Sequence, residues 1–198
     1  MVPQPTWQGI PVVIKEYFIG YLDYKTICRL RVCSKSDRDF VDACSIALRA
    51  VKFDLNNKVL DIIKGGEQVE IRENIADYFC KLFEHKDITV EDVILSWYFR
   101  DSVDDIKKKL FAKLENFPKI KAKNVNIETY KVSDQEYRQI FGMFDPIHMK
   151  SIDINAEVSQ EEVDYLVGTD GWKNAKSIKF NSTRYISIER VLHTDYIQ

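Results

Sequence analysis

The chain has 198 residues, of which 45% are hydrophobic and 30% are charged. This length fits one domain or two, because domains usually hold about 100 to 150 residues, and the apolar fraction is large enough to bury a core. With 29 basic and 31 acidic residues the formal net charge is only -2, which excludes a global field that attracts nucleic acid or an anionic membrane. The sequence therefore predicts a soluble globular protein that recognises its partners through local surfaces.

Charged residues interrupt every apolar run before it reaches the roughly 20 residues of a membrane span. The N-terminal Met-Val-Pro-Gln-Pro lacks the basic start and apolar core of a signal peptide. We therefore expect an intracellular protein, in the cytoplasm, the nucleus or both. The four cysteines are expected to be reduced thiols in the core rather than a disulfide framework: Cys28, Cys33, Cys44 and Cys80.

Residues 7–49 have the pattern of three short helices. Pro11 opens the first helix, where its missing N–H costs nothing. Asp23 is a candidate N-cap for the second helix, and Ser34 or Ser36 for the third. The apolar residues recur at helical spacing: Ile14, Phe18, Tyr21 and Leu22 in the first helix, Ile27 and Leu30 in the second, and Phe40, Val41, Cys44, Leu48 and Val51 in the third.

This N-terminal pattern resembles the F-box, the module through which a large protein family binds a Skp1-type adaptor and thereby a cullin-based ubiquitin ligase. The family's Leu-Pro start corresponds to Ile10-Pro11, and its Val-Cys/Ser-Arg/Lys segment to residues 32–35. Val12-Val13 and Asp37 differ from the usual residues, which are polar at the first place and large and apolar at the second. The alternative is an ordinary three-helix start to a globular domain. The resemblance assigns adaptor contacts to Ile10, Pro11, Ile14, Phe18, Leu22, Ile27, Leu30, Val32 and Cys33.

From about residue 50 the pattern changes to alternating strands. Gly65-Gly66 supplies the positive φ angles of a tight hairpin turn between aliphatic segments, and we expect this hairpin to join two modules. A helix at residues 75–83, a strand at 90–98 and a helix at 103–117 follow.

Three short strands then repeat at an even spacing. Val125 lies 27 residues before Ile152, and Ile152 lies 26 residues before Ile178. Ser133 caps one intervening helix, and Ser159 with Glu162 forms the capping box of another. Strand–helix units of this length predict a leucine-rich-repeat-like solenoid with a mainly parallel sheet, although the usual leucine-asparagine motif is absent. The alternative is a non-repetitive α/β domain with evenly spaced strands.

The segment Gly171-Trp172-Lys173-Asn174-Ala175-Lys176, followed by a strand, and the Asp145-Pro146 turn resemble the FTH domain that follows the F-box in an expanded nematode family, the F-box A type. The resemblance implies an α/β protein, α+β overall, with a three-helix module at residues 7–49 and an FTH-like repeat domain at 50–198. Full-length members of the family extend further, so the C-terminal end is expected to be incomplete. A last short helix is expected at residues 186–192.

Catalytic constellations are lacking. His85, His148 and His193 are scattered, no Cys-x-x-Cys or zinc-ligand spacing occurs, and the glycines form no phosphate-binding loop. Cys28 and Cys33 lie among apolar neighbours without an activating base nearby in sequence, which favours buried structural thiols over nucleophiles. We therefore predict a non-enzyme without metal or cofactor.

Lysines concentrate between residues 107 and 123, a pattern that fits either RNA binding or a solvated helix face. Acidic residues interrupt the run and aromatic residues interleave poorly, so the solvated face is favoured and no nucleic acid partner is expected. The cluster consists of Lys107, Lys108, Lys109, Lys113, Lys119, Lys121 and Lys123.

Two functions from different classes remain. In the first, the helices bind a Skp1-type adaptor and the repeat domain holds an unknown target protein. In the second, the helices only cap the solenoid of a scaffold or regulatory binding module. Alternation in the repeated strands sends polar residues to the face without helices, where they form either the target site or merely a soluble surface: Asn126, Glu128, Asp153, Asn155, Lys179 and Asn181.

Overall fold

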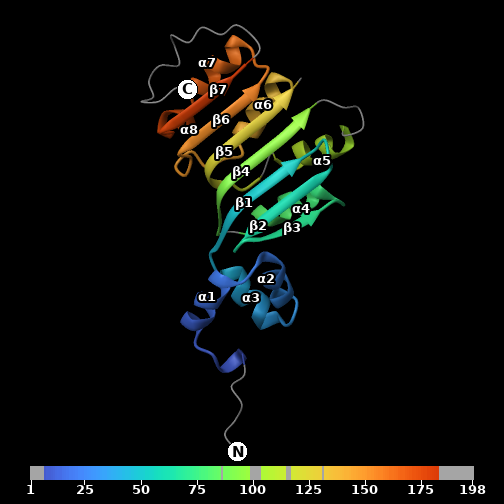
Figure 1. Cartoon of the computed structure of the whole chain (residues 1–198), viewed down its shortest axis with the longest axis vertical. Coiled ribbons are helices and arrows are strands. Elements are labelled where there is room, and N and C mark those ends of the chain that lie inside the picture. The colour runs from blue at the N-terminus through green and yellow to red at the C-terminus, as the bar shows by residue number, and fades with distance from the viewer. Residues whose placement is uncertain (1–6, 86, 99–103, 115–116, 131, 183–198) are drawn as a thin grey trace, which may run out of the picture.

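The computed structural model describes residues 7–85, 87–98, 104–114, 117–130 and 132–182. Its N-terminal helices lie at one end of a long molecule, below a twisted sheet (Figure 1). These helices are α1 (Val12–Tyr21), α2 (Tyr24–Arg31) and α3 (Lys35–Ala43), preceded by a 3-10 turn at Trp7–Gly9.

The predicted caps of α2 and α3 are confirmed. The Asp23 carboxylate accepts a hydrogen bond from the backbone N–H of Thr26 at 2.8 Å, and the Ser34 hydroxyl accepts one from Asp37 at 3.0 Å. The predicted extent of the third helix was wrong, because α3 ends at Ala43 and Leu48 and Val51 belong to the first strand. Pairing with β4, in which Leu48 lies beside Val90 and Val51 beside Val93, makes this segment a strand.

A seven-stranded sheet follows, in the order β3-β2-β1-β4-β5-β6-β7. β2 pairs antiparallel with both β1 and β3, whereas β1, β4, β5, β6 and β7 are parallel. Gly65 (φ 61°) and Gly66 (φ 86°) make the turn of the predicted hairpin. The strands are β1 (Ile46–Asp54), β2 (Val59–Lys64), β3 (Glu67–Ile71), β4 (Ile88–Tyr98), β5 (Lys121–Tyr130), β6 (Ser151–Ala156) and β7 (Ser177–Asn181).

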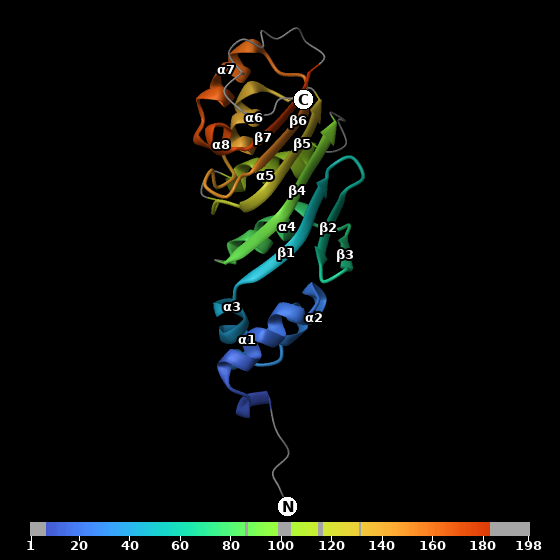
Figure 2. The same ribbon diagram turned by 60° about the vertical axis from the view of Figure 1, so that its left-hand side comes forward.

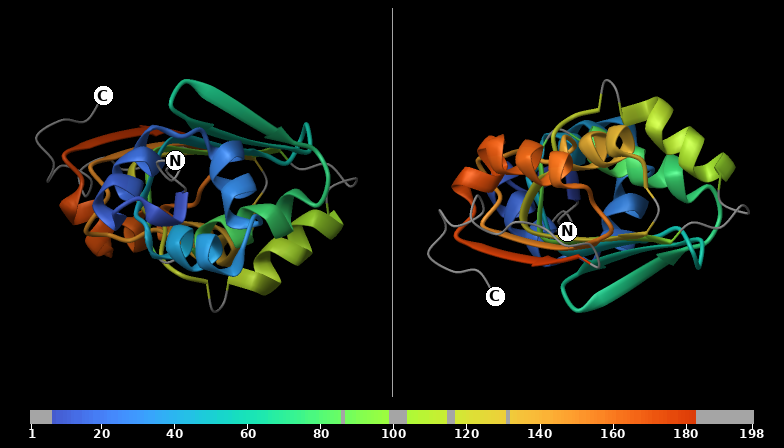
Figure 3. Two further views of the ribbon diagram at one scale, coloured as in Figure 1. Left: turned by 90° about the horizontal axis from the view of Figure 1, so that it is seen from below. Right: turned by 90° about the horizontal axis from the view of Figure 1, so that it is seen from above.

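The helices that connect the parallel strands all cover one face of the sheet (Figure 2), and within the described residues no helix covers the other face of β4–β7 in the turned views (Figure 3). They are α4 (Ile75–Glu84), α5 (Asp104–Leu114), α6 (Asp134–Phe141), α7 (Gln160–Gly168) and α8 (Asp170–Asn174). The core lies between these helices and the sheet, where Trp172, Phe79 and Leu95 are fully buried. The uncovered face of β4–β7 is called the open face below.

The evenly spaced strands of the sequence prediction lie in register with one another in the sheet. Val93, Val125, Ile152 and Ile178 occupy one row across β4, β5, β6 and β7. These residues are at most 1% exposed, so the row runs through the core. Strand–helix units therefore stack on a mainly parallel sheet, as the sequence predicted. The helix expected at residues 186–192 lies outside the described residues.

The two caps within the repeats differ from each other. Ser133 and Glu136 form a complete capping box, with each side chain bonded to the other's backbone. Ser159 accepts from the backbone N–H of Glu162 at 3.2 Å, but the Glu162 side chain turns inward and accepts from Arg138 at 2.8 Å. The predicted second box is thus only half formed, because the fully buried Glu162 side chain takes a charged partner instead.

Two of the four cysteines are not core residues. Cys44 and Cys80 are buried as predicted, but Cys28 and Cys33 are exposed. In α2, Ile27 belongs to the core and Leu30 is partly buried against it, which leaves Cys28 on the exposed side, whereas Cys33 lies beyond the end of α2. The lysine cluster is largely a paired, solvated surface, since four of its members form ion pairs: Lys107 with Glu136, Lys113 with Asp77, Lys121 with Asp87 and Lys123 with Glu91.

One lysine ties the N-terminal helices to the sheet. Lys64, the last residue of β2, is only 4% exposed, and its ammonium group donates to the backbone carbonyls of Ile19, Gly20 and Leu22 at 3.2, 2.8 and 2.5 Å. These carbonyls lie at the C-terminal end of α1, where helix geometry leaves them without partners and where a positive charge is favoured. Burial lowers the pKa of Lys64, and the nearby Asp23 carboxylate opposes that shift.

We expect Lys64→Met to lower the free energy of unfolding by about 2 kcal/mol, because three carbonyls lose their shared donor while the side-chain volume is kept. Chemical denaturation followed by circular dichroism measures the change. Lys52→Met, at an exposed position on β1, is the matched control and should leave stability nearly unchanged. Equal stability of the two variants would show that the joint does not depend on this ammonium group.

Candidate functional site

An apolar patch covers α1 and the turn after α2. Its members keep between 46% and 74% of their surface exposed, which is unusual for such side chains on one short module: Val12, Val13, Ile14, Tyr17, Phe18, Tyr21 and Val32. We call this set the helical surface. Tyr17 and Tyr21 lie against each other with ring centroids 4.9 Å apart, and their hydroxyls are hydrogen-bonded at 3.0 Å.

The nine residues assigned to adaptor binding divide into three groups. Pro11, Ile14, Phe18, Val32 and Cys33 are exposed, and Ile10, Leu22 and Leu30 are partly buried. Ile27 is only 2% exposed and belongs to the core. Sequence reasoning missed Tyr17 and Tyr21 as surface residues, although their spacing of four, one helical turn, places them on the same side of α1.

The hydrogen bonds of Asp37 explain how the module accommodates its carboxylate at a position where a large apolar residue is usual. The side chain is 7% exposed and accepts from the indole N–H of Trp7 at 2.9 Å and from the Ser34 hydroxyl at 2.7 Å. Trp7 in turn packs edge-on against Phe40, with Lys15 above its ring. The 3-10 turn is thereby fixed against α3, which holds the start of α1 in place.

The open face carries the two predicted polar rows in register. Asn126, Asp153 and Lys179 are direct neighbours across β5, β6 and β7, and Glu128, Asn155 and Asn181 form the next row. Lys179, Asn155 and Asn181 are exposed, and the other three are half-buried. Ser96 of β4 extends the second row by donating to Glu128 at 3.1 Å. The structure therefore brings all six predicted residues together on one surface.

Asn126 stands out within these rows. Its side-chain oxygen is buried and has no hydrogen-bond partner among the described residues. A buried unsatisfied acceptor costs about 1–3 kcal/mol, so the residue is not optimal for stability. A ligand group that donates a hydrogen bond would satisfy it.

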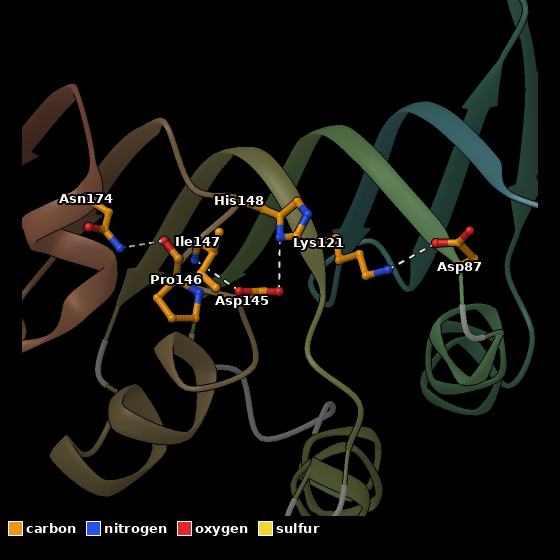
Figure 4. Close-up of polar contacts among 7 residues, drawn as sticks. All are labelled: Asp87, Lys121, Asp145, Pro146, Ile147, His148 and Asn174. Carbon is orange, nitrogen blue, oxygen red and sulfur yellow. Dashed lines mark hydrogen bonds and ion pairs between the residues drawn. The ribbon is translucent and has the colours of Figure 1, made fainter.

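Polar contacts also link the amino ends of the parallel strands (Figure 4). Lys121 pairs with Asp87 at 3.0 Å, which connects β5 to the start of β4. His148 contacts Asp145 at 3.0 Å within the turn before β6, and Asn174 donates to a carbonyl of that same turn at 3.3 Å. These contacts hold neighbouring units together and occupy the polar groups that form them.

Comparison with protein families matches both parts of the chain. An F-box domain model matches residues 7–48, and an FTH domain model matches residues 100–198, which is half of the chain. The chain is an F-box protein with a C-terminal FTH domain. F-box domains generally bind Skp1-type adaptors, and they support an adaptor role in ubiquitin ligases of the Skp1-cullin type. Comparison with curated proteins and comparison with solved structures each gave no match.

In the F-box–FTH protein, no cysteine whose pKa departs from the usual value has the lowered pKa of an activated thiol. Desolvation raises the pKa of Cys28 at the wall of a cavity of about 690 Å³ between α2, α3 and α4, and burial raises the pKa of Cys80 to about 11. Both thiols therefore stay protonated near neutral pH, which disfavours nucleophilic attack. Among the described residues no group of His, Cys, Asp and Glu could hold a metal ion, and no helix is long and apolar enough to span a membrane.

We expect Asn126→Val to raise the free energy of unfolding by about 1 kcal/mol, because it removes the unpartnered oxygen and adds a β-branched residue to a strand. Thermal unfolding compares it with Asn155→Val, an exposed neighbour on the same face that gains only the strand preference. A variant that is less stable than the parent would mean that the Asn126 oxygen is satisfied in solution.

Proposed function

We propose that this F-box–FTH protein is the substrate-recruiting subunit of a Skp1-cullin-type ubiquitin ligase. The F-box helices bind a Skp1-type adaptor, and the repeat domain binds a target protein that other subunits modify. In this role the chain itself makes and breaks no covalent bond. Exposed Cys28 and Cys33 fit the reducing cytoplasm or nucleus, where such a ligase would act.

The single observation that carries the adaptor half is the helical surface. Burying an exposed apolar side chain against a partner contributes roughly 1.5–3 kcal/mol, and contiguous apolar patches on soluble proteins mark interaction sites. The patch lies on α1 and on Val32 just after α2, whereas the open face belongs to β4–β7 farther along the molecule (Figure 1). An adaptor and a target can therefore be bound at the same time without competing for one surface.

The second candidate is a scaffold or regulatory module in which the F-box helices only cap the sheet. Lys64 favours it, because the contact with three carbonyls of the α1 end makes the helices a structural continuation of the domain. Pull-down of the full chain with purified Skp1-type adaptor discriminates between the two. Capture of the adaptor supports the ligase subunit, and its absence supports the scaffold.

We expect Ile14→Ser/Phe18→Ser to weaken adaptor binding by about 100-fold or more, since each side chain contributes at least roughly 1.5 kcal/mol and 1.4 kcal/mol is tenfold in affinity. Calorimetric titration of adaptor into the full chain measures the loss. The double variant Ile10→Ala/Pro11→Ala, at the family's Leu-Pro position, should also bind markedly less. Ile147→Ser removes a 72% exposed side chain away from the helices and serves as the control. Unchanged affinity in both double variants rules out this docking surface.

The triple variant Asn126→Ala, Asp153→Ala and Lys179→Ala is expected to abolish target recruitment while sparing adaptor binding. The physical reason is that it removes one entire polar row from the open face without touching the core row. A target first identified by co-purification with the parent chain is then tested by pull-down with the variant.

A matched triple variant at exposed positions on β3, on the connection before α4 and on α4 provides the control: Gln68→Ala, Glu73→Ala and Lys81→Ala. It should recruit the target as the parent does. If the target binds both triple variants equally well, recognition lies on the loops or on the helical side of the domain.

A further inference from the structure

Three lysines lie side by side near the amino ends of β5, β6 and β7. The backbone N–H of Lys150 donates to the carbonyl of Lys123 at 2.8 Å, and that of Lys176 donates to the carbonyl of Lys150 at 2.8 Å. Neighbouring strands are about 4.8 Å apart, so three positive side chains stand within roughly 10 Å. We call Lys123, Lys150 and Lys176 the lysine row.

The lysine row lies at the edge of the sheet where these strands begin. Each lysine follows a buried residue, namely Ala122, Met149 or Ala175, while all three lysines are exposed. Each lysine also stands two positions before a member of the core row, and Lys150 and Lys176 precede the first residues of β6 and β7, so the row lies at this edge and not within the polar rows of the open face.

The row continues toward β1 along a shallow depression of about 450 Å³. Arg49, Lys121, Lys123 and His148 line it together with Glu91. Glu91 neutralises Lys123 at 3.2 Å. For Lys150 and Lys176 there is no ion pair to any residue that the structure describes.

Like charges on directly adjacent strands destabilise a sheet. The ammonium groups of Lys150 and Lys176 therefore repel each other without a carboxylate partner among the described residues. An anionic ligand would offset this repulsion. The open-face residues nearest to the lysine row are acidic in part, with Asp92 on β4 beside Asn124 and with Asp153 on β6. A long polyanion such as RNA would meet these carboxylates, whereas a short acidic segment would contact only the lysines.

We propose that the lysine row binds an acidic segment of the target protein, with carboxylates at alternate positions of an extended chain. Side chains two residues apart on an extended segment lie on one side, about 6.8 Å from each other, so two carboxylates fit between three lysines spaced about 4.8 Å apart. This inference rests on the proposed role in target binding and gives the chemical class of the recognised segment.

The test is a titration of the isotope-labelled full chain with a short peptide that contains Asp-Ser-Asp-Ser-Asp, followed by amide chemical shifts. We expect shifts at Lys150, Lys176 and their strand neighbours, which weaken as salt is added. Lys150→Gln/Lys176→Gln should reduce the affinity at least about tenfold, as expected for the loss of two charge contacts. Lys58→Gln/Lys81→Gln, at exposed lysines elsewhere, is the matched control.

The Lys150→Gln/Lys176→Gln variant should melt at or above the temperature of the parent, since it removes repulsion, and it should bind the adaptor normally. The inference is overturned if the Asn-Ser-Asn-Ser-Asn peptide binds as well, if both lysine variants bind equally, or if single-stranded RNA binds more tightly at the same residues. Failure of the adaptor titration with the parent chain, by contrast, counts against the ligase role and leaves the peptide result standing.

Discussion

The buried ammonium group of Lys64 sets how the F-box helices sit on the sheet. It satisfies three carbonyls at the end of α1, which otherwise would face the core without donors. Gly65 and Gly66 follow immediately, and their positive φ angles turn the chain back into β3. One hairpin thus supplies both the edge of the sheet and the cap of a helix, and this joins the F-box helices to the sheet as a structural unit.

The parallel sheet has the same asymmetry in each unit. Apolar residues such as Val125 and Ile127 face the helices, while Asn126 and Glu128 between and beside them face the open side. Because the strands are in register, residues at equivalent positions of successive strands line up in a row across the sheet. This is how short polar side chains, weak recognition elements singly, form a continuous surface.

The features proposed to bind partners are those that do least for stability. The exposed apolar side chains of α1 contribute no burial free energy, and the Asn126 oxygen is buried without a partner among the described residues. Lys150 and Lys176 stand next to each other and form no ion pair within the described residues. Selection for folding stability alone would not favour these residues, since replacing each by an ordinary surface or strand residue is expected to be neutral or stabilising.

Local patterns in the sequence determined the helices, the caps at Asp23 and Ser34, the glycine turn and the row positions of the repeated strands, because each depends on neighbours within a few residues. The tertiary structure decided what depends on distant partners. Leu48 became a strand residue because β4 pairs with its segment, and Glu162 left its capping role because Arg138 lies 24 positions away in sequence but within 2.8 Å in space. Burial of Ile27 likewise follows from packing, which periodicity alone does not specify.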